Sequence, residues 1–360
     1  MKIAFRADAS LQIGSGHVMR CLTLADSLKA QGATCHFICR AHSGHLMEVI
    51  RQRGYLVNSL TAPVTQHTPD HPAHAAWLGS TWQADTQETA AVLASLQPDW
   101  LVVDHYALDQ RWESALKPHY KKLLVIDDLA DRAHICDVLL DQNLVESMTS
   151  RYQCKVPAHC TCLLGPEYAL VRPEFNMLRP ASLARRSTTS LRRLLVFMGG
   201  SDASNETGKV IAGIQLSNFT WQHIDVVVGQ SYPALHSLIE SLLNLPVAKL
   251  HVHTPHMAQL MAAADLAVTT GGSVTWEKCT LGVPSFVVID GANQQPIATM
   301  MHERGAQRTL GLASDITPAM YAAQLDRLQA REFTAMSHCA GAICDGTGIA
   351  FVIKTIQTQT

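Results

Sequence analysis

Residues 2–21, KIAFRADASLQIGSGHVMRC, lead from a short apolar strand through a glycine-rich turn into an amphipathic helix. We expect the strand at 2–6 and the helix at about 17–31. A strand, a tight turn and a helix in this order open a parallel sheet that is covered by helices. The turn at 14–16, Gly-Ser-Gly, lets the backbone bend sharply and lets a ligand come close. It is not the dinucleotide-binding fingerprint, because Met19 stands where that pattern needs its third glycine.

The same alternation of apolar runs and helical segments continues along the chain and predicts parallel sheets covered on both faces. The further expected strands are 34–39, 55–60, 100–104, 122–127, 138–141, 194–198, 223–228, 250–253, 266–270 and 285–289. The alternation pauses at 172–193. That stretch is basic, rich in Ser and Thr, and contains two prolines, so we interpret it as a linker.

The pattern therefore predicts an α/β protein with two doubly wound, Rossmann-like domains that face a cleft. The expected parts are a first domain (1–175), a linker (176–192), a second domain (193–345) and a C-terminal helix (346–360) that could return to the first domain. Ligands of doubly wound sheets bind outside the carboxyl ends of the strands. The cleft is therefore the expected site.

Composition excludes several classes of protein. The 360 residues are enough for roughly two domains, and the formal net charge of −2 leaves no basic footprint for nucleic acid. No apolar run approaches the ~18 residues of a membrane span. The N-terminus turns polar at Arg6, too early for a signal peptide, so we expect a cytoplasmic protein. The ten cysteines form no CxxC pair, as expected of reduced thiols. We expect a monomer that acts on a small molecule.

His17 is the first candidate for catalysis. It falls in the first turn of the expected helix, whose positive end disfavours an imidazolium ion. A neutral imidazole is the form that a general base requires. Arg6, Asp8 and Arg20 lie nearby in the sequence. The alternative is a histidine that only caps or packs against the helix.

A second group of residues surrounds a glycine-rich turn at 271–273, Gly-Gly-Ser, which follows an expected strand and opens a helix. Free backbone N–H groups at that helix start suit a diphosphate. Glu277, one turn further on, could accept hydrogen bonds from two ribose hydroxyls; otherwise it is an exposed helical glutamate. Asn293 and Gln294 follow the next strand, where their amides could orient a sugar or a diphosphate, or cap the helix.

Two more strand ends carry polar residues. The run Gly199-Gly200-Ser201-Asp202 could bind a ligand, or it is a plain turn in which Asp202 or Ser204 caps a helix. At the run 104–106, Asp-His-Tyr, either ring could reach a sugar, and Asp104 could equally cap the edge of the core.

Absent motifs narrow the chemistry. The sequence has no Asp-x-Asp pair, no Walker loop, no HExxH and no GxSxG. We therefore expect no metal and no other cofactor.

Five motifs together resemble one family. They are RADxSxxIGxGHxxRC (6–21), DHY (104–106), YALVRPEF (168–175), FMGGSD (197–202) and GGSxTWE…GVP…NQ (271–294). In this order they resemble the UDP-2,4-diacetamido-2,4,6-trideoxy-β-L-altropyranose hydrolases of pseudaminic acid biosynthesis. The second half is also similar to the UDP-binding domain of the peptidoglycan N-acetylglucosaminyltransferase, which has the GT-B architecture. This chain is longer than compact members of the family, and we expect the extra length around 61–82 and in the C-terminal region.

The resemblance implies hydrolysis of a UDP-sugar at the anomeric carbon, with inversion and without a metal. It releases UDP and 2,4-diacetamido-2,4,6-trideoxy-L-altrose. It implies that His17 is the base, that Tyr106 lies near the sugar, and that Glu277 and Asn293 bind UDP. The full prediction places Arg6, Asp8, Gly16, Tyr106 and Asn293 at the sugar, and Gly199, Gly200, Ser201, Gly272, Ser273, Glu277, Asn293 and Gln294 at UDP.

The chemistry of the leaving group agrees with a single base. By analogy with a phosphate monoester, whose second pKa is about 6, a departing diphosphate is only weakly basic. It can leave without a general acid if backbone N–H groups stabilise its charge. Two other functions stay open on the sequence: a GT-B glycosyltransferase that uses a lipid or glycan acceptor, and a non-catalytic protein that binds a nucleotide sugar.

Overall fold

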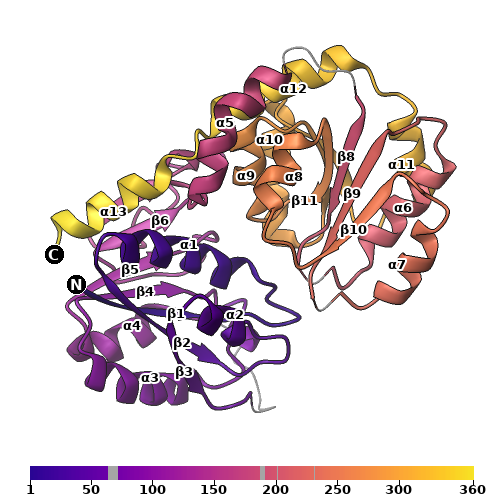
Figure 1. Cartoon of the computed structure of the whole chain (residues 1–360). Helices are drawn as coiled ribbons and strands as arrows, with labels where there is room; N and C mark the ends of the chain where they lie inside the picture. The colour runs from indigo at the N-terminus through magenta and orange to yellow at the C-terminus, as the bar shows by residue number, and fades with distance from the viewer. Residues whose placement is uncertain (64–71, 187–190, 201, 231) are drawn as a thin grey trace. The chain divides into compact units, whose positions relative to one another are not determined.

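A computed structural model describes residues 1–360 except 64–71, 187–190, 201 and 231. The chain divides into two compact units (Figure 1). Unit 1 comprises 1–143, 147–170 and 348–360, and unit 2 comprises 144–146 and 171–347. Each unit is a parallel sheet with helices on both faces, so the prediction of two doubly wound α/β domains is confirmed.

The sheet of unit 1 has seven strands in the order β3-β2-β1-β4-β5-β6-β7. Its strands are β1 (Lys2–Ala7), β2 (Thr34–Arg40), β3 (Leu56–Leu60), β4 (Trp100–Asp104), β5 (Lys122–Ile126), β6 (Val138–Asp141) and β7 (Thr161–Leu164). Its helices are α1 (Gly16–Ala30), α2 (Met47–Gln52), η1 (Ala75–Leu78), α3 (Trp82–Leu96), α4 (Gln110–Leu116), η2 (Lys117–His119), η3 (Pro166–Tyr168) and α13 (Gly348–Thr358).

Alternating strand residues build a core on each face of this sheet. On one face Phe5 and Val102 pack with Leu22 of α1 and Ile353 of α13, and Figure 1 shows α13 beside α1. On the other face a second cluster joins strand residues to Leu93 of α3 and Trp112 of α4. Both faces are buried, which explains why the central strands are continuous apolar runs.

The sheet of unit 2 has six strands in the order β10-β9-β8-β11-β12-β13. Its strands are β8 (Arg193–Phe197), β9 (His223–Val228), β10 (Ala248–Val252), β11 (Leu266–Thr270), β12 (Ser285–Ile289) and β13 (Arg308–Leu312). Its helices are α5 (Pro173–Arg186), α6 (Glu206–Leu216), α7 (Leu235–Leu242), α8 (Met257–Ala263), α9 (Val274–Leu281), η4 (Ala292–Gln294), α10 (Gln295–Glu303), α11 (Pro318–Leu325) and α12 (Ala330–Ile343).

The predicted linker at 176–192 is wrong over most of its length, because Pro173–Arg186 forms the helix α5. Its basic residues bind carbonyl oxygens near the ends of neighbouring helices: Arg179 donates to Thr280 and Gly341, and Arg186 to Met261 and Ala264. Cationic side chains are favourable at the carboxyl ends of helices. The composition that suggested a linker therefore belongs to a packed helix.

Each sheet has a point at which the direction of winding reverses. In unit 1 it lies between β1 and β4, and in unit 2 between β8 and β11. In open α/β sheets, ligands bind outside the carboxyl ends of the strands at such a point. The loops after these four strands contain most of the predicted site residues of both units.

The stretch Ala330–Thr358 has the length and composition of a membrane span. The structure breaks it at 344–347, between α12 and α13, and Gly346 has a φ of +78° there. On α12, Phe333 packs in the core of unit 2, and on α13, Val352 packs in the core of unit 1. Both apolar faces are therefore used for packing within their units.

A network of buried charges joins β1, β2 and α3. Arg6 pairs with Asp8 and with Asp85, at 2.7 Å in each case, and Arg40 also reaches Asp85 at 2.8 Å. The side chains of Arg6, Arg40 and Asp85 are fully buried. Burying these charges is tolerated only because each has partners of the opposite sign.

We predict that Asp85→Ala lowers the free energy of unfolding by about 3–5 kcal/mol, because it leaves two buried guanidinium groups without their shared carboxylate. The matched control is Glu48→Ala, which removes an ion pair whose side chains are 47% and 68% exposed. Such exposed pairs contribute about 0–1 kcal/mol. Urea denaturation of the three proteins measures the difference, and equal losses for the two variants would contradict the assignment.

Candidate functional site

His17 and Asp104 meet at the reversal point of unit 1. Asp104 is the last residue of β4 and pairs in register with Ala7, the last residue of β1. After β1, the chain passes through the glycine-rich turn at 14–16 and enters α1. The first turn of α1 places His17 over the end of β4. The Nδ1 atom of His17 lies 2.5 Å from Oδ1 of Asp104.

Arg20, one turn further along α1, binds the same carboxylate. Its Nε donates to one oxygen of Asp104 at 2.6 Å, and its terminal nitrogen donates to the other at 2.7 Å. Burial by itself would raise the pKa of Asp104, but Arg20 and His17 outweigh it and hold that pKa well below its usual value. Asp104 is therefore ionised at neutral pH and can only accept hydrogen bonds.

This arrangement fixes how the imidazole is used. Because ionised Asp104 has no proton to donate, Nδ1 of His17 must carry the hydrogen between them. The remaining nitrogen, Nε2, is then the atom available to a ligand or to water. The sequence left open whether Asp104 was only a cap at the edge of the core; the structure shows it as the partner of His17.

Asp128, just beyond β5, extends the network. One of its oxygens accepts hydrogen bonds from Arg20 and from the Tyr106 hydroxyl, both at 2.6 Å. Its other oxygen accepts from Asn143 at 3.1 Å. Burial, together with the charge of Asp128, raises the pKa of the neighbouring Asp141 to about 7. The end of β5 is thus a second carboxylate anchor for α1.

Tyr106 lies beside His17, with its ring edge-on at 4.6 Å between centroids. Its hydroxyl is bound by Asp128, and only 3% of the residue is exposed. His105 is also buried, and its Nε2 atom lies 3.2 Å from a carboxylate oxygen of Asp8. Both residues are therefore buried supports in this structure, and contact of Tyr106 with a sugar stays a prediction.

Two aromatic residues at the site were not identified from the sequence. Trp77 of η1 stacks on Tyr106 at 5.6 Å, and its ring centroid is 6.4 Å from that of His17. His74 lies edge-on to Trp77 at 4.6 Å, and burial lowers its pKa. Both belong to the extra stretch at 61–82, in which 64–71 lie outside the described residues.

Arg6 and Asp8 require a correction. They were expected beside the sugar, but both side chains are fully buried and paired with each other. Charged residues at a strand end suggest a ligand; here they stabilise the sheet below the site. Gly16 is partly exposed at the start of α1, where its contact with a sugar stays a prediction.

The loop after β11 leaves its helix start open in unit 2. A Cβ added at Gly272 would meet no atom within 4 Å, and Ser273 is exposed. No side chain caps the start of α9. The backbone N–H groups there suit an anion. The Gln294 side chain supports this loop, because its oxygen accepts from the backbone of Gly271 and of Asp290 at 3.1 Å each. Asn293 is exposed.

The loop after β8 approaches the neighbouring loop after β9 closely. Gly199 has a φ of +95°, which favours glycine, and a Cβ added at Gly229 would lie 1.8 Å from the carbonyl oxygen of Gly200. Asp202 accepts hydrogen bonds from the backbone N–H groups of Glu206 and Thr207. It therefore caps the start of α6, which was one of the two alternatives that the sequence left open for this turn. Ser201 lies outside the described residues.

Glu277 lies in the first turn of α9, and its side chain is 20% exposed. Arg172 binds its carboxylate at 2.9 Å. Burial raises the pKa of Glu277, while Arg172 acts in the opposite direction.

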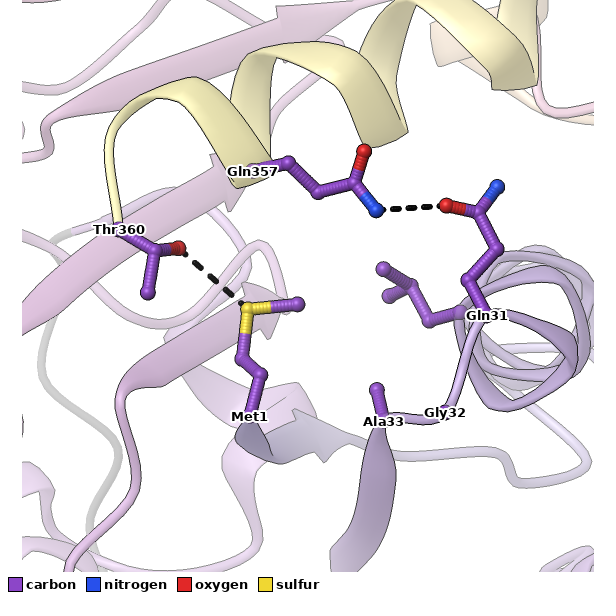
Figure 2. A pocket seen from close by; sticks show the side chains of 7 residues that line it. Met1, Gln31, Gly32, Ala33, Gln357 and Thr360 are labelled. Carbon is purple, nitrogen blue, oxygen red and sulfur yellow. Dashed lines mark hydrogen bonds between the residues drawn. The ribbon is translucent and has the colours of Figure 1, made fainter.

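Among the described residues, no three or more His, Cys, Asp or Glu side chains are grouped to hold a metal ion. Figure 2 shows one pocket of unit 1, where Gln357 donates to Gln31 at 2.6 Å beside Met1 and Thr360. It lies at the C-terminal end of α1, whereas His17 is at the N-terminal end. Its lining has no carboxyl, imidazole or thiol side chain.

Comparison with known proteins points to sugar metabolism. No protein-family model matches the chain. The chain is 24% identical over 306 residues to the UDP-2,4-diacetamido-2,4,6-trideoxy-beta-L-altropyranose hydrolase of Campylobacter jejuni, covering 85% of this chain and 97% of that one. It is 28% identical over 196 residues to the spore coat polysaccharide biosynthesis protein SpsG of Bacillus subtilis, covering 54% and 57%. An uncharacterized protein of Methanocaldococcus jannaschii is 23% identical over 82% of this chain, which spans 57% of its length.

Solved structures define the fold. MurG of Acinetobacter baumannii is 15% identical, with a TM-score of 0.67 over 99% of each chain. UGT2 of Phytolacca americana, complexed with UDP-2fluoro-glucose and pterostilbene, is 12% identical, with a TM-score of 0.68 over 99% of this chain and 98% of that one. The chain has the two-domain fold of GT-B glycosyltransferases, and its sequence supports a family-level relation to the Campylobacter hydrolase.

Proposed function

We propose that this protein hydrolyses UDP-2,4-diacetamido-2,4,6-trideoxy-β-L-altropyranose at the anomeric C–O bond, with inversion. The products are UDP and 2,4-diacetamido-2,4,6-trideoxy-L-altrose, an intermediate of pseudaminic acid biosynthesis. The observation that carries the proposal is the hydrogen bond between His17 Nδ1 and ionised Asp104, which leaves Nε2 as a base. The similarity to the Campylobacter hydrolase, which spans nearly all of that protein, supports the choice of substrate.

In the proposed reaction, Nε2 of His17 takes a proton from water. The water oxygen attacks the anomeric carbon on the face opposite UDP, and the electrons of the breaking C–O bond go to the diphosphate oxygen. Asp104 stabilises the imidazolium that forms, as a carboxylate does beside any histidine base. Because a diphosphate leaves readily, one base replaces the two carboxyl groups that glycoside hydrolysis normally requires.

Unit 2 would hold the nucleotide. We assign the diphosphate to the open start of α9 and its loop, with Gly272 and Ser273, and the ribose to Glu277. The other assigned UDP residues are Gly199, Gly200, Ser201, Asn293 and Gln294. Backbone N–H groups at a helix start can stabilise the negative charge that the leaving diphosphate acquires. The absence of an Asp-x-Asp pair supports a reaction without a metal. That expectation, the cytoplasmic location and the monomeric state all stay predictions.

The reaction is tested in heavy-oxygen water, with the UDP-sugar, EDTA and no acceptor. We predict UDP release under these conditions, with the label in the sugar and not in UDP, because water attacks carbon. Label in UDP would mean attack at phosphorus. Turnover only after an acceptor is added would identify a glycosyltransferase. Binding of the UDP-sugar without turnover would identify a binding protein, and turnover that is lost in EDTA and restored by magnesium would identify a metal-dependent enzyme. Each of these outcomes contradicts the proposal.

Substitutions should separate catalysis from nucleotide binding. We predict that His17→Asn and Asp104→Asn each lower kcat by roughly 10²–10⁴-fold, because the first removes the base and the second removes the charge that supports it. UDP affinity measured by calorimetry should stay unchanged in both. Glu277→Ala should instead weaken UDP binding by about 1–3 kcal/mol, mainly as a rise in KM.

The control for these variants is His236→Asn, since the side chain of His236 is 90% exposed. It should behave as the wild type in both assays. A near-normal kcat for His17→Asn would remove His17 from the catalytic role.

A further inference from the structure

Arg172 connects two sequence motifs that the proposed mechanism leaves unconnected. It belongs to the YALVRPEF stretch and lies just before α5, whereas Glu277 belongs to the GGSVTWE stretch on α9. The Nε atom of Arg172 donates to Oε1 of Glu277 at 3.0 Å, and its terminal nitrogen approaches the same oxygen at 2.9 Å. In the part of the chain that the structure describes, no hydrogen-bond donor reaches Oε2 of Glu277.

The guanidinium of Arg172 is itself held in place. Its other terminal nitrogen lies 3.2 Å from Glu174, and the group stacks 4.8 Å from the ring centroid of Phe175, which is fully buried. The side chain of Arg172 is only 17% exposed. A planar cation with contacts on its edge and on its face has little freedom, so it fixes the orientation of the carboxylate that it binds.

We propose that Arg172 is a positioning residue for the nucleotide: it occupies Oε1 of Glu277 and so presents Oε2 to the ribose hydroxyls of UDP. This rests on the proposed role of Glu277 and deepens it. A carboxylate oxygen with no partner, on a side chain that solvent reaches, is the acceptor that a ribose diol requires.

Charges around Glu277 give Arg172 a second effect. Burial raises the pKa of Glu277, and the nearby Glu174 acts in the same direction, whereas Arg172 opposes both. Lys278, the next residue of α9, does not compensate, because its ammonium group binds Thr269 and Ser285 in the core. Without Arg172, Glu277 would therefore become protonated at a higher pH and lose acceptor strength there.

The test is UDP binding, measured by calorimetry at about pH 8 and about pH 5.5, on either side of the diphosphate titration. The proteins are the wild type, Arg172→Met, Arg172→Lys, Glu277→Gln and the double variant Arg172→Met/Glu277→Gln. Because UDP itself titrates equally in every sample, each Kd is expressed as a ratio to the wild type at the same pH. The control is Arg327→Met, which removes an exposed guanidinium group outside the proposed nucleotide site. Thermal melting confirms that each variant is folded.

We expect Arg172→Met to weaken UDP binding on the order of tenfold, and by a larger ratio at the lower pH, where a larger fraction of Glu277 would then carry a proton. Arg172→Lys should restore part of the affinity and most of the wild-type pH dependence, because it retains the charge. The double variant should bind no more weakly than Glu277→Gln and should lose the extra pH dependence. The control Arg327→Met should bind UDP as the wild type does at both pH values.

Two results would overturn the inference separately from the proposed function. If Glu277→Gln weakens UDP binding but Arg172→Met and Arg172→Lys do not, the nucleotide site stands and the role of Arg172 is wrong. The same conclusion follows if Arg172→Met weakens binding equally at both pH values and equally in the Glu277→Gln background. If Glu277→Gln leaves UDP affinity unchanged, the proposed nucleotide site fails as well. If Arg172→Met does not fold, the UDP affinity of Arg172→Lys is compared with that of Glu277→Gln, and the same outcomes support or overturn the role of Arg172.

Discussion

The site of unit 1 depends on the hydrogen bonds and ion pairs that the carboxylate of Asp104 makes. This carboxylate is buried at the end of β4, and a buried charge is tolerated only with partners. Here the partners are His17 and Arg20, both on the first turns of α1. The need to neutralise one charge therefore fixes the start of α1 over the end of the sheet and orients the imidazole. Arg20 carries the same constraint onward to Asp128 and, through it, to the Tyr106 hydroxyl.

Both units use the reversal point of a parallel sheet, but in different ways. Unit 1 fills it with side chains that hold one histidine, above a layer of buried ion pairs around Arg6 and Asp85. Unit 2 keeps it open, with Gly272 unobstructed and the start of α9 uncapped. A directed base requires a rigid side-chain network, whereas a diphosphate is recognised mainly by free backbone N–H groups. The division of labour proposed here follows from that difference.

The sequence was sufficient where structure is local. The apolar runs predicted the central strands to within one or two residues, and the glycine-rich turn pointed to His17 and the start of α1. It was insufficient where partners are distant. Asp104 lies 87 residues from His17, so nothing near either residue identifies the pair. The edge strands β7 and β13 are half-exposed and lack an apolar run, and α5 has the composition of a linker because its arginines serve neighbouring helix ends. Arg6 and Asp8 were assigned to a ligand because a buried ion pair and a binding pair have the same residue types.

The most direct test of this account is the protonation of His17 itself. Nitrogen NMR of protein labelled with ¹⁵N-histidine, with the His17 signals assigned by their loss in His17→Asn, distinguishes the two neutral tautomers. The account predicts that the neutral imidazole carries its hydrogen on Nδ1, toward Asp104, and none on Nε2, with that preference lost in Asp104→Asn. A neutral imidazole with its hydrogen on Nε2 in the wild-type protein, or a spectrum that Asp104→Asn leaves unchanged, would contradict it.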